Sequence, residues 1–172
     1  MLKNLFYFLG GLLLGAILFS LGKNYYEGHF NRLSSSIDFN KSGYAEQLVS
    51  GWYQLESPSS GGYRWTGKKA VARLGCEPGF KHVTASVYIR DINVYPEKSI
   101  DVDLQVNDQT VQSRHFEKSG LYTIEGPLPP GLTVSEMTVA ISLNKVFVPS
   151  QIGQGDDQRQ LGIVVSALGC TK

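Results

Sequence analysis

The chain is poor in the residues that most often carry chemistry. Its 172 residues include only two cysteines and three histidines, so redox and metal-binding candidates are few from the outset. No Cys-x-x-Cys, His-x-His or EF-hand spacing occurs. No Gly-x-Ser-x-Gly motif marks a serine nucleophile either. These absences predict a protein that is not an enzyme and that uses neither a metal nor a cofactor.

The chain also lacks an excess of charge of either sign. Sixteen lysines and arginines against fifteen acidic residues give a net charge of +1, and no run of like charges occurs. Nucleic-acid-binding domains usually carry a clustered basic surface. The sequence therefore predicts no nucleic-acid partner.

Only one long apolar run is present, and it lies at the amino end. The stretch LFYFLGGLLLGAILFSL, residues 5–21, has about 17 residues, the short end of what spans a bilayer as a helix. It predicts a transmembrane signal-anchor over residues 1–22 with the lipid bilayer as a partner. A cleaved signal peptide is the alternative, because Lys3 precedes the run and Ser20 and Gly22 have cleavage-site spacing.

The charges beside this run do not decide its orientation. Lys3 and the terminal amine precede it, and Lys23 and Arg32 follow it, nearly a tie under the positive-inside rule. A signal-anchor at the start of a chain commonly exports the domain on its C-terminal side. We therefore expect a single-pass membrane protein whose C-terminal domain lies outside the cytoplasm, periplasmic or extracellular.

Two glycines within the run have a spacing that suits helix packing. Gly11 and Gly15 form a Gly-x-x-x-Gly step, which lets the backbone of another membrane helix approach closely. This step predicts a membrane-protein partner. The alternative is that glycine is simply frequent in membrane helices.

The remainder divides into a stalk and a globular domain. Residues 23–49 show no sustained period and contain Gly, Asn and Ser clusters, typical of a linker with at most a short helix over 43–49. We expect the folded domain to cover residues 50–172.

Hydrophobic residues in the domain recur with a period of two. Residues 83–89, 100–106 and 137–143 alternate apolar and polar side chains, and 161–169 form a more continuous apolar strand. A turn at 107–109 predicts a hairpin. With no helical window after the anchor, the pattern favours an all-β fold, an antiparallel β-sandwich of jelly-roll type preceded by one transmembrane α-helix.

The two cysteines each end an apolar segment. Cys76 closes AVARLGC and Cys170 closes VVSALGC. In an exported domain the pair is expected to form a disulfide, whereas in a cytosolic domain two buried thiols are expected. Spacing alone leaves both open.

Several short motifs occur in a recognisable order. GWYQLES at 51–57, GGYRWTGKKA at 61–70 and VFVPSQIGQGDDQRQLGIVVSAL at 146–168 together resemble a β-sandwich module of bacterial surface-polysaccharide machinery. That module often accompanies membrane-bound glycosyltransferase domains and has a carbohydrate-binding-like fold. The resemblance implies a glycan partner and a place at the bacterial cell membrane.

The motifs supply the candidate ligand-binding residues. These are Trp52, Glu56, Arg64, Trp65, Asp157 and Arg159. Trp52 is the better candidate for a sugar platform, since burial of a large apolar ring favours the core for Trp65. Arg64 would then point outward onto a carboxylate such as Glu56 or Asp157.

The loop that carries Asp157 and Arg159 has two interpretations. It can be a polar ligand rim, because binding residues collect on loops, or a local ion pair that pins the loop to the sandwich. The sequence as a whole predicts a non-catalytic glycan-binding or accessory component at the cell envelope. The alternative function is a structural subunit of a larger integral-membrane complex, docked through its helix and its sandwich.

Overall fold

A computed structural model describes residues 33–57, 61–130 and 136–172. The predicted anchor over residues 1–22, with Gly11 and Gly15, lies outside these residues. Within the described ranges no helix has both the length and the apolar character needed to cross a membrane.

The described chain consists of nine strands and four short 3-10 turns. The strands are β1 (Ser36–Asp38), β2 (Leu48–Glu56), β3 (Tyr63–Leu74), β4 (His82–Ile89), β5 (Ile100–Val106), β6 (Gln109–Phe116), β7 (Gly120–Pro127), β8 (Met137–Leu143) and β9 (Val164–Thr171). The turns are η1 (Ala45–Gln47), η2 (Ile92–Val94), η3 (Pro96–Lys98) and η4 (Pro149–Ile152). All strand pairs are antiparallel, which confirms the predicted all-β antiparallel class.

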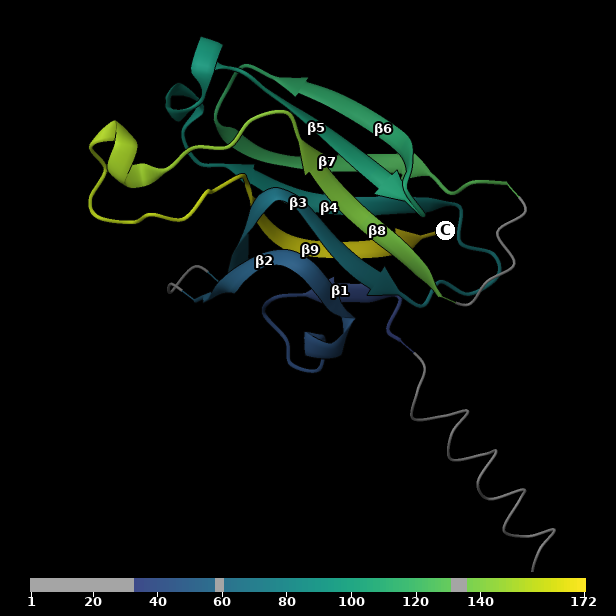
Figure 1. The fold of residues 1–172 in the computed structure, drawn as a ribbon. Coiled ribbons are helices and arrows are strands. Elements are labelled where there is room, and N and C mark those ends of the chain that lie inside the picture. The colour runs from purple at the N-terminus through teal and green to yellow at the C-terminus, as the bar shows by residue number, and fades with distance from the viewer. Residues whose placement is uncertain (1–32, 58–60, 131–135) are drawn as a thin grey trace, which may run out of the picture. The chain divides into compact units, whose positions relative to one another are not determined.

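The strands form two layers that share β3 (Figure 1). One layer runs β6-β5-β8-β3, and the other runs β7-β4-β9 with β1 beside β9. The long strand β3 pairs with β8 over residues 69–74 and with β9 over residues 64–65. Because β3 connects both layers, they form one continuous sheet folded on itself instead of the two separate sheets of a simple sandwich.

The alternation in the sequence fills the space between the layers. In β4 the side chains of Val83, Ala85, Val87 and Ile89 are buried, while the residues between them are at least partly exposed. Strand β5 has the same pattern, and β8 departs from it only at Ala140, which is also buried. One apolar face from each layer therefore makes a common core, as the period of two predicts.

The predicted hairpin forms between β5 and β6. Asn107 and Asp108 occupy its two central positions with φ of 48° and 63°. Positive φ at both positions is typical of a type I′ turn, whose twist suits a two-residue hairpin. The Asn107 side chain accepts a hydrogen bond from the Thr138 amide at 2.9 Å, so the turn is also tied to β8.

The folded domain begins earlier than residue 50. It is compact from Leu33 onward, and β1 pairs with β9. Ile37 and Phe39 are buried in the core at 0% and 2% exposure. The stalk predicted over 23–49 is therefore too long, because a three-residue strand has no period to detect. The short helix predicted over 43–49 is the 3-10 turn η1.

The two cysteines are joined in this structure. Cys76 and Cys170 form a disulfide with their Cα atoms 6.0 Å apart. Next to it, the Cys170 amide donates a hydrogen bond to the Ser35 carbonyl at 2.9 Å, and the Gly75 amide donates to the Ser34 carbonyl at 3.0 Å. The disulfide thus lies where the described chain begins, between the end of β9 and the segment after β3.

The hairpin carries an exposed histidine with acidic neighbours. His115 Nδ1 lies 2.6 Å from Asp101 Oδ1, and its Nε2 lies 3.6 Å from Glu117 Oε1. The hydrogen bond to Asp101 is the main reason that the pKa of His115 is raised above 6.5.

A raised pKa makes the contribution of His115 to stability dependent on pH. The contribution is complete below the unfolded-state value of 6.5 and is lost as the pH rises through the folded-state pKa. We expect His115→Gln to lose this part of the pH dependence. Urea unfolding at about pH 5.5 and about pH 9 measures it. Equal pH dependence in wild type and variant would contradict the pairing.

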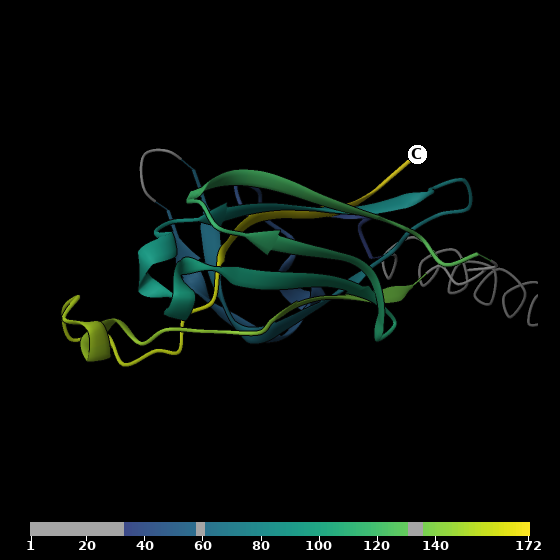
Figure 2. The ribbon, with the colours of Figure 1, turned by 90° about the horizontal axis from the view of Figure 1, so that it is seen from above.

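Three of the four 3-10 turns lie at one end of the domain. Two views related by 90° show η2, η3 and η4 at the end opposite the C-terminus (Figures 1 and 2). Strand β4 ends there and β7 begins there. Loops collected at one end of a rigid set of strands are a common place for binding residues.

Candidate functional site

A cleft of about 700 Å³ opens at the end that carries η2 and η4. Its size is within the range of small-molecule sites. It is formed by the end of β2, the connection from β4 to β5, and the loop from β8 to β9. The lining residues are Glu56, Trp65, Tyr88, Arg90, Asp91, Val94, Tyr95, Phe147, Pro149, Gln154, Asp157, Arg159 and Leu161.

The floor of the cleft is apolar and buried. Trp65, Tyr95, Phe147 and Leu161 are each at most 9% exposed. Phe147 packs edge-to-face against Trp65 at 5.9 Å and against Tyr95 at 5.5 Å between ring centroids, an arrangement that suits the aromatic quadrupoles. The floor is therefore part of the hydrophobic core, and the packing of the core fixes the shape of the floor.

The Tyr95 hydroxyl joins two of the loops that form the cleft. It donates a hydrogen bond to the Gly162 carbonyl at 2.5 Å, which links η2 to the residues before β9. Burial, followed by the nearby Asp91 carboxylate, raises the pKa of Tyr95 well above its usual value. The hydroxyl accordingly remains a neutral donor at physiological pH.

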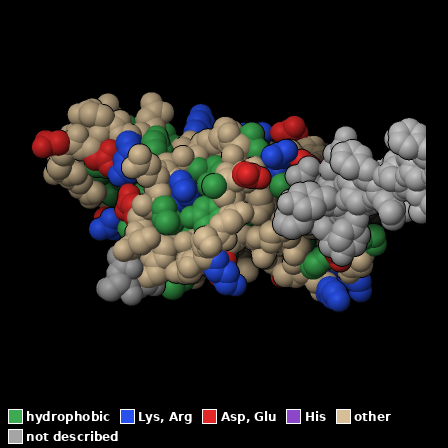
Figure 3. Space-filling model, turned by 90° about the horizontal axis from the view of Figure 1, so that it is seen from below, with side chains coloured by type: hydrophobic (Ala, Val, Ile, Leu, Met, Phe, Trp, Pro, Cys, Tyr) green, Lys and Arg blue, Asp and Glu red, His purple; other side chains and the backbone are tan. Residues whose placement is uncertain are grey.

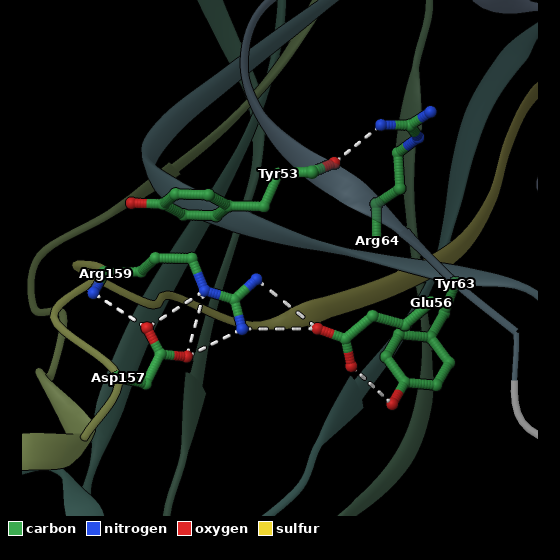
Figure 4. A network of polar contacts seen from close by, with 6 residues as sticks. All are labelled: Tyr53, Glu56, Tyr63, Arg64, Asp157 and Arg159. Carbon is green, nitrogen blue, oxygen red and sulfur yellow. Dashed lines mark hydrogen bonds and ion pairs between the residues drawn. The ribbon is translucent and has the colours of Figure 1, made fainter. Parts of the chain in front are cut away.

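One rim of the cleft is a charged network around Arg159 (Figure 4). Arg159 Nη2 lies 2.6 Å from Asp157 Oδ2, and its Nε lies 3.0 Å and 2.9 Å from the two Asp157 oxygens. Its Nη1 and Nη2 each lie 3.4 Å from Glu56 Oε1. One guanidinium thus connects the β8–β9 loop to the end of β2.

Hydrogen bonding sets the charge states within this rim. Hydrogen bonds from the Arg159 side chain and amide lower the pKa of Asp157, and the Asp157 side chain raises the pKa of Arg159. The Tyr63 hydroxyl donates to Glu56 Oε2 at 2.9 Å. Burial first, and then this bond, raises the pKa of Tyr63. The rim at neutral pH therefore presents ionised carboxylate oxygens with fixed donors between them.

The Arg159 side chain is supported from above by an aromatic ring. Its guanidinium carbon lies 5.4 Å from the centroid of the Tyr53 ring, within the range of a cation–π contact. The Tyr53 hydroxyl donates to the Gln160 carbonyl at 3.0 Å. These contacts hold the rim in place before any ligand binds, which lowers the entropy cost of binding.

The mouth of the cleft has an exposed aromatic residue beside an exposed cation. Tyr88 is 38% exposed at the end of β4, and Arg90 follows two residues later, also exposed. Among the residues that the structure describes, Arg90 has no hydrogen bond or ion pair shown. Its guanidinium donors are accordingly available to a ligand.

The structure brings together three of the six predicted binding residues as expected for a ligand site. Glu56, Asp157 and Arg159 form the rim of the cleft. The ion pair that pins the loop to the sandwich is present, and the interpretation of the loop as a ligand rim stays a prediction. Trp65 is 4% exposed, in agreement with its expected place in the core, and its side chain is part of the cleft floor.

Arg64 does not pair with Glu56 or Asp157, so this prediction is wrong. Its Nη1 donates to the Tyr53 carbonyl at 2.6 Å, and its guanidinium lies 5.7 Å from the rings of both Phe39 and Tyr44. The reason is a bulge in β2, where Tyr53 and Gln54 face one residue of β3 and the register shifts. The bulge frees the Tyr53 carbonyl as an acceptor.

Trp52 lies outside the cleft and is not retained as a sugar platform. Its ring packs on Phe39 at 5.6 Å between centroids, and its indole N–H donates to the Val71 carbonyl at 2.8 Å. The ring is half-buried against the core. An aromatic ring that is held by the core and by a backbone carbonyl has little free face to offer a ligand.

Sequence reasoning missed Tyr88 and Arg90. Both lie in the stretch HVTASVYIRD, where the alternation places Tyr88 on the solvent face of β4. The available signal for a binding site was a large aromatic residue on a solvent face, followed by an arginine at the end of the strand. It lacked weight because a single exposed tyrosine is common on protein surfaces.

The donor set offers little to a metal ion. In residues 33–57, 61–130 and 136–172, no group of three His, Cys, Asp or Glu side chains is placed to hold one. The side chains of Asp101 and Asp103, both on β5, are hydrogen-bonded to His115, Asn144 and Ser113. Neither carboxylate lines the cleft.

No protein-family model matches the chain, and no curated protein matches it either. Solved structures do show a distant likeness. The CBM36-1 domain of a multidomain xylanase from the hindgut metagenome of Trinervitermes trinervoides has 11% identity and a TM-score of 0.42, with 80% of this chain and 95% of that chain covered. A carbohydrate-binding module CBM36 in complex with calcium and xylotriose has 11% identity and a TM-score of 0.42, with 79% and 98% covered.

A third similar structure belongs to a much larger protein. Dimeric latent PorU from Porphyromonas gingivalis has 8% identity and a TM-score of 0.45, with 80% of this chain but only 12% of that chain covered. At such identities and scores, the likeness to these proteins says nothing of a ligand. The ligand class has to follow from the cleft itself.

Proposed function

We propose that this domain is a non-catalytic glycan-binding module. The observation that carries the proposal is the combination of an exposed aromatic ring, Tyr88, with a preorganised polar rim around Arg159 in one cleft. A sugar ring has an apolar C–H face and hydroxyls at its edge, each of which both donates and accepts. The Tyr88 ring can pack on the apolar C–H face, and the alternating donors and acceptors of the rim can hydrogen-bond to the hydroxyls.

The same rim supports a non-catalytic role. Glycoside hydrolysis requires one carboxyl group of raised pKa to protonate the leaving group. The pKa of Asp157 is lowered by Arg159, and Glu56 shares the same guanidinium. Two carboxylates held by one cation are suited to accepting hydrogen bonds from sugar hydroxyls and not to proton donation.

The cellular place of the module is part of the proposal. With the anchor expected over residues 1–22, the domain is a single-pass accessory component at a bacterial cell membrane, outside the cytoplasm and close to polysaccharide assembly. The disulfide supports an oxidising compartment. The cleft opens at the end of the domain opposite the C-terminus and the disulfide.

Loss of the Tyr88 ring tests the function directly. We expect Tyr88→Ala to weaken binding of glucose, xylose or galactose oligosaccharides by about tenfold, the effect of losing one stacked ring. Isothermal titration measures the affinity, and a melting curve checks the fold. Val49→Ala is the matched control, because Val49 is 55% exposed but lies outside the cleft. No sugar binding by the wild type, or equal affinity in Tyr88→Ala, would contradict the proposal.

A second function, a structural subunit of a membrane complex, has one observation in its favour. Viewed from below, hydrophobic side chains gather in the middle of one face of the described domain (Figure 3). Val49 and Leu55 of β2 are 55% and 40% exposed, and β2 pairs only with β3 among the named strands. Extraction in mild detergent with mass spectrometry separates the two functions, since a subunit travels in a stoichiometric assembly.

A further inference from the structure

Two exposed hydrophobic side chains lie side by side at the mouth of the cleft. Tyr88 of β4 and Leu121 of β7 are directly opposite in the antiparallel register. They are 38% and 78% exposed, and opposite residues in a sheet point to the same face with Cβ atoms about 5 Å apart. Together they make a small apolar patch on the outer face of the β4–β7 pair.

The patch is continuous with the cleft. Tyr88 is one of the residues that line the cleft, and Leu121 is the second residue of β7, which begins at that end of the domain. A ligand that occupies the cleft and extends past Tyr88 therefore meets Leu121 next. Leu121 is not itself a lining residue, so the patch extends the surface of the cleft beyond its lining.

Beyond the patch, the same face continues as a row of polar side chains. The next outward pair is Ser86 and Thr123, followed by Thr84 and Glu125. Both members of the first of these pairs are small and carry hydroxyls. This face of the β4–β7 pair therefore offers hydrogen-bonding groups directly beyond the apolar patch.

We infer that Leu121, beside Tyr88, forms a second subsite, which binds the next residue of a glycan chain whose first residue lies in the cleft against Tyr88. The inference rests on the proposed function and adds that the ligand is a chain and not a single sugar. Each ring of a linear glycan repeats the same pattern of apolar face and hydroxyl edge. An apolar patch bordered by the hydroxyls of Ser86 and Thr123 offers contacts of both kinds.

A protein partner fits this surface less well. Stable protein interfaces bury about 800 Å² on each partner around a well-packed apolar centre. Here only two apolar side chains are exposed side by side, and the residues beyond them on this face, Ser86, Thr123, Thr84 and Glu125, are polar. The patch is the right scale for one sugar ring and too small for the centre of a protein interface.

The test is the dependence of affinity on chain length. The full-length protein is titrated with glucose, xylose and galactose and with their linear oligosaccharides of about two to six units, the range that one cleft plus one extra subsite requires. We expect affinity to rise by about tenfold from one unit to two or three and then to level off. In Leu121→Ser, this rise should fall to about twofold while the monosaccharide affinity is unchanged.

The controls separate the two proposals. Val49→Ser removes another exposed apolar side chain, 55% exposed and on a different strand, and should leave the rise intact. Equal affinity for one unit and for longer chains, or a full rise in Leu121→Ser, would overturn the second subsite and leave the cleft proposal standing. No binding of any sugar would overturn both. Self-association that Leu121→Ser abolishes would assign the patch to a protein contact instead.

Discussion

Replacing Cys76 and Cys170 together with serine is expected to lower the free energy of unfolding by about 4 kcal/mol. The disulfide closes a loop with a sequence separation of 94 residues, and the entropy cost of closing a loop in the unfolded chain grows with its length. Apart from the backbone, no other covalent link holds the last strand to the rest of the described chain. Within the described chain, the disulfide is therefore expected to be among the largest single contributions to stability.

The loss is expected to be local as well as global. Ser34 and Ser35 accept hydrogen bonds from Gly75 and Cys170, on either side of the disulfide. Without the covalent link, the first residues of the domain and the end of β9 open together. Hydrogen exchange of the Cys170 amide, or of the serine amide that replaces it, should then speed up more than that of the β5–β8 core.

Urea unfolding with and without reductant measures the effect. The wild type should shift to a lower midpoint when reductant is present, and the double serine variant should be insensitive to it. The double variant serves as the control, because reductant has no other target in this chain, which contains only two cysteines. Equal midpoints for oxidised and reduced wild type would show that the link adds nothing.

Truncating Trp65 is the second large effect. We expect Trp65→Ala to lower the free energy of unfolding by about 3–5 kcal/mol, the usual cost of removing a buried tryptophan side chain. Trp65 is 4% exposed and packs against Phe147. Because both rings belong to the cleft floor, the same change should also abolish sugar binding under conditions where the protein is still folded.

Two further variants separate stability from binding. Trp65→Phe keeps an aromatic ring in the floor and should lose less stability and retain part of the affinity. Trp52→Ala removes the other tryptophan, whose ring packs on Phe39 outside the cleft. It should lose stability but keep the affinity of the wild type. Loss of sugar binding in Trp52→Ala with an intact fold would make Trp52 a platform residue again.

The charged rim illustrates why local sequence reasoning misassigned one arginine. Arg64 and Arg159 are each close in sequence to an aromatic residue or a carboxylate, and each was expected at the ligand site. Only Arg159 reaches the carboxylates, since Asp157 is two residues away and Glu56 is brought to it by the end of β2. The bulge in β2 instead directs the Tyr53 carbonyl to Arg64.

The strand β3 shows a similar limit. Strict alternation predicts opposite faces for Trp65 and Thr66, yet both are buried at 4% and 0%. At this point β3 leaves its pairing with β8 and pairs with β9, and the segment before β9 lies against Thr66, whose hydroxyl accepts a hydrogen bond from the Ile163 amide at 3.1 Å. Alternation assumes one buried face, and a strand that belongs to two layers does not satisfy that assumption.

The sequence by itself determined the class of the fold and most of its strands. The period of two in β4, β5 and β8, and the turn at 107–109, are local patterns that follow from the geometry of a half-buried strand. The burial of Trp65 followed from its size. What only the tertiary structure decided is the site: the bulge in β2, the short strand β1, and the meeting of Glu56, Tyr88 and Arg159 at one end. These depend on contacts between residues distant in the chain, and no periodicity encodes such contacts because each segment has the same local pattern whichever partner it finds.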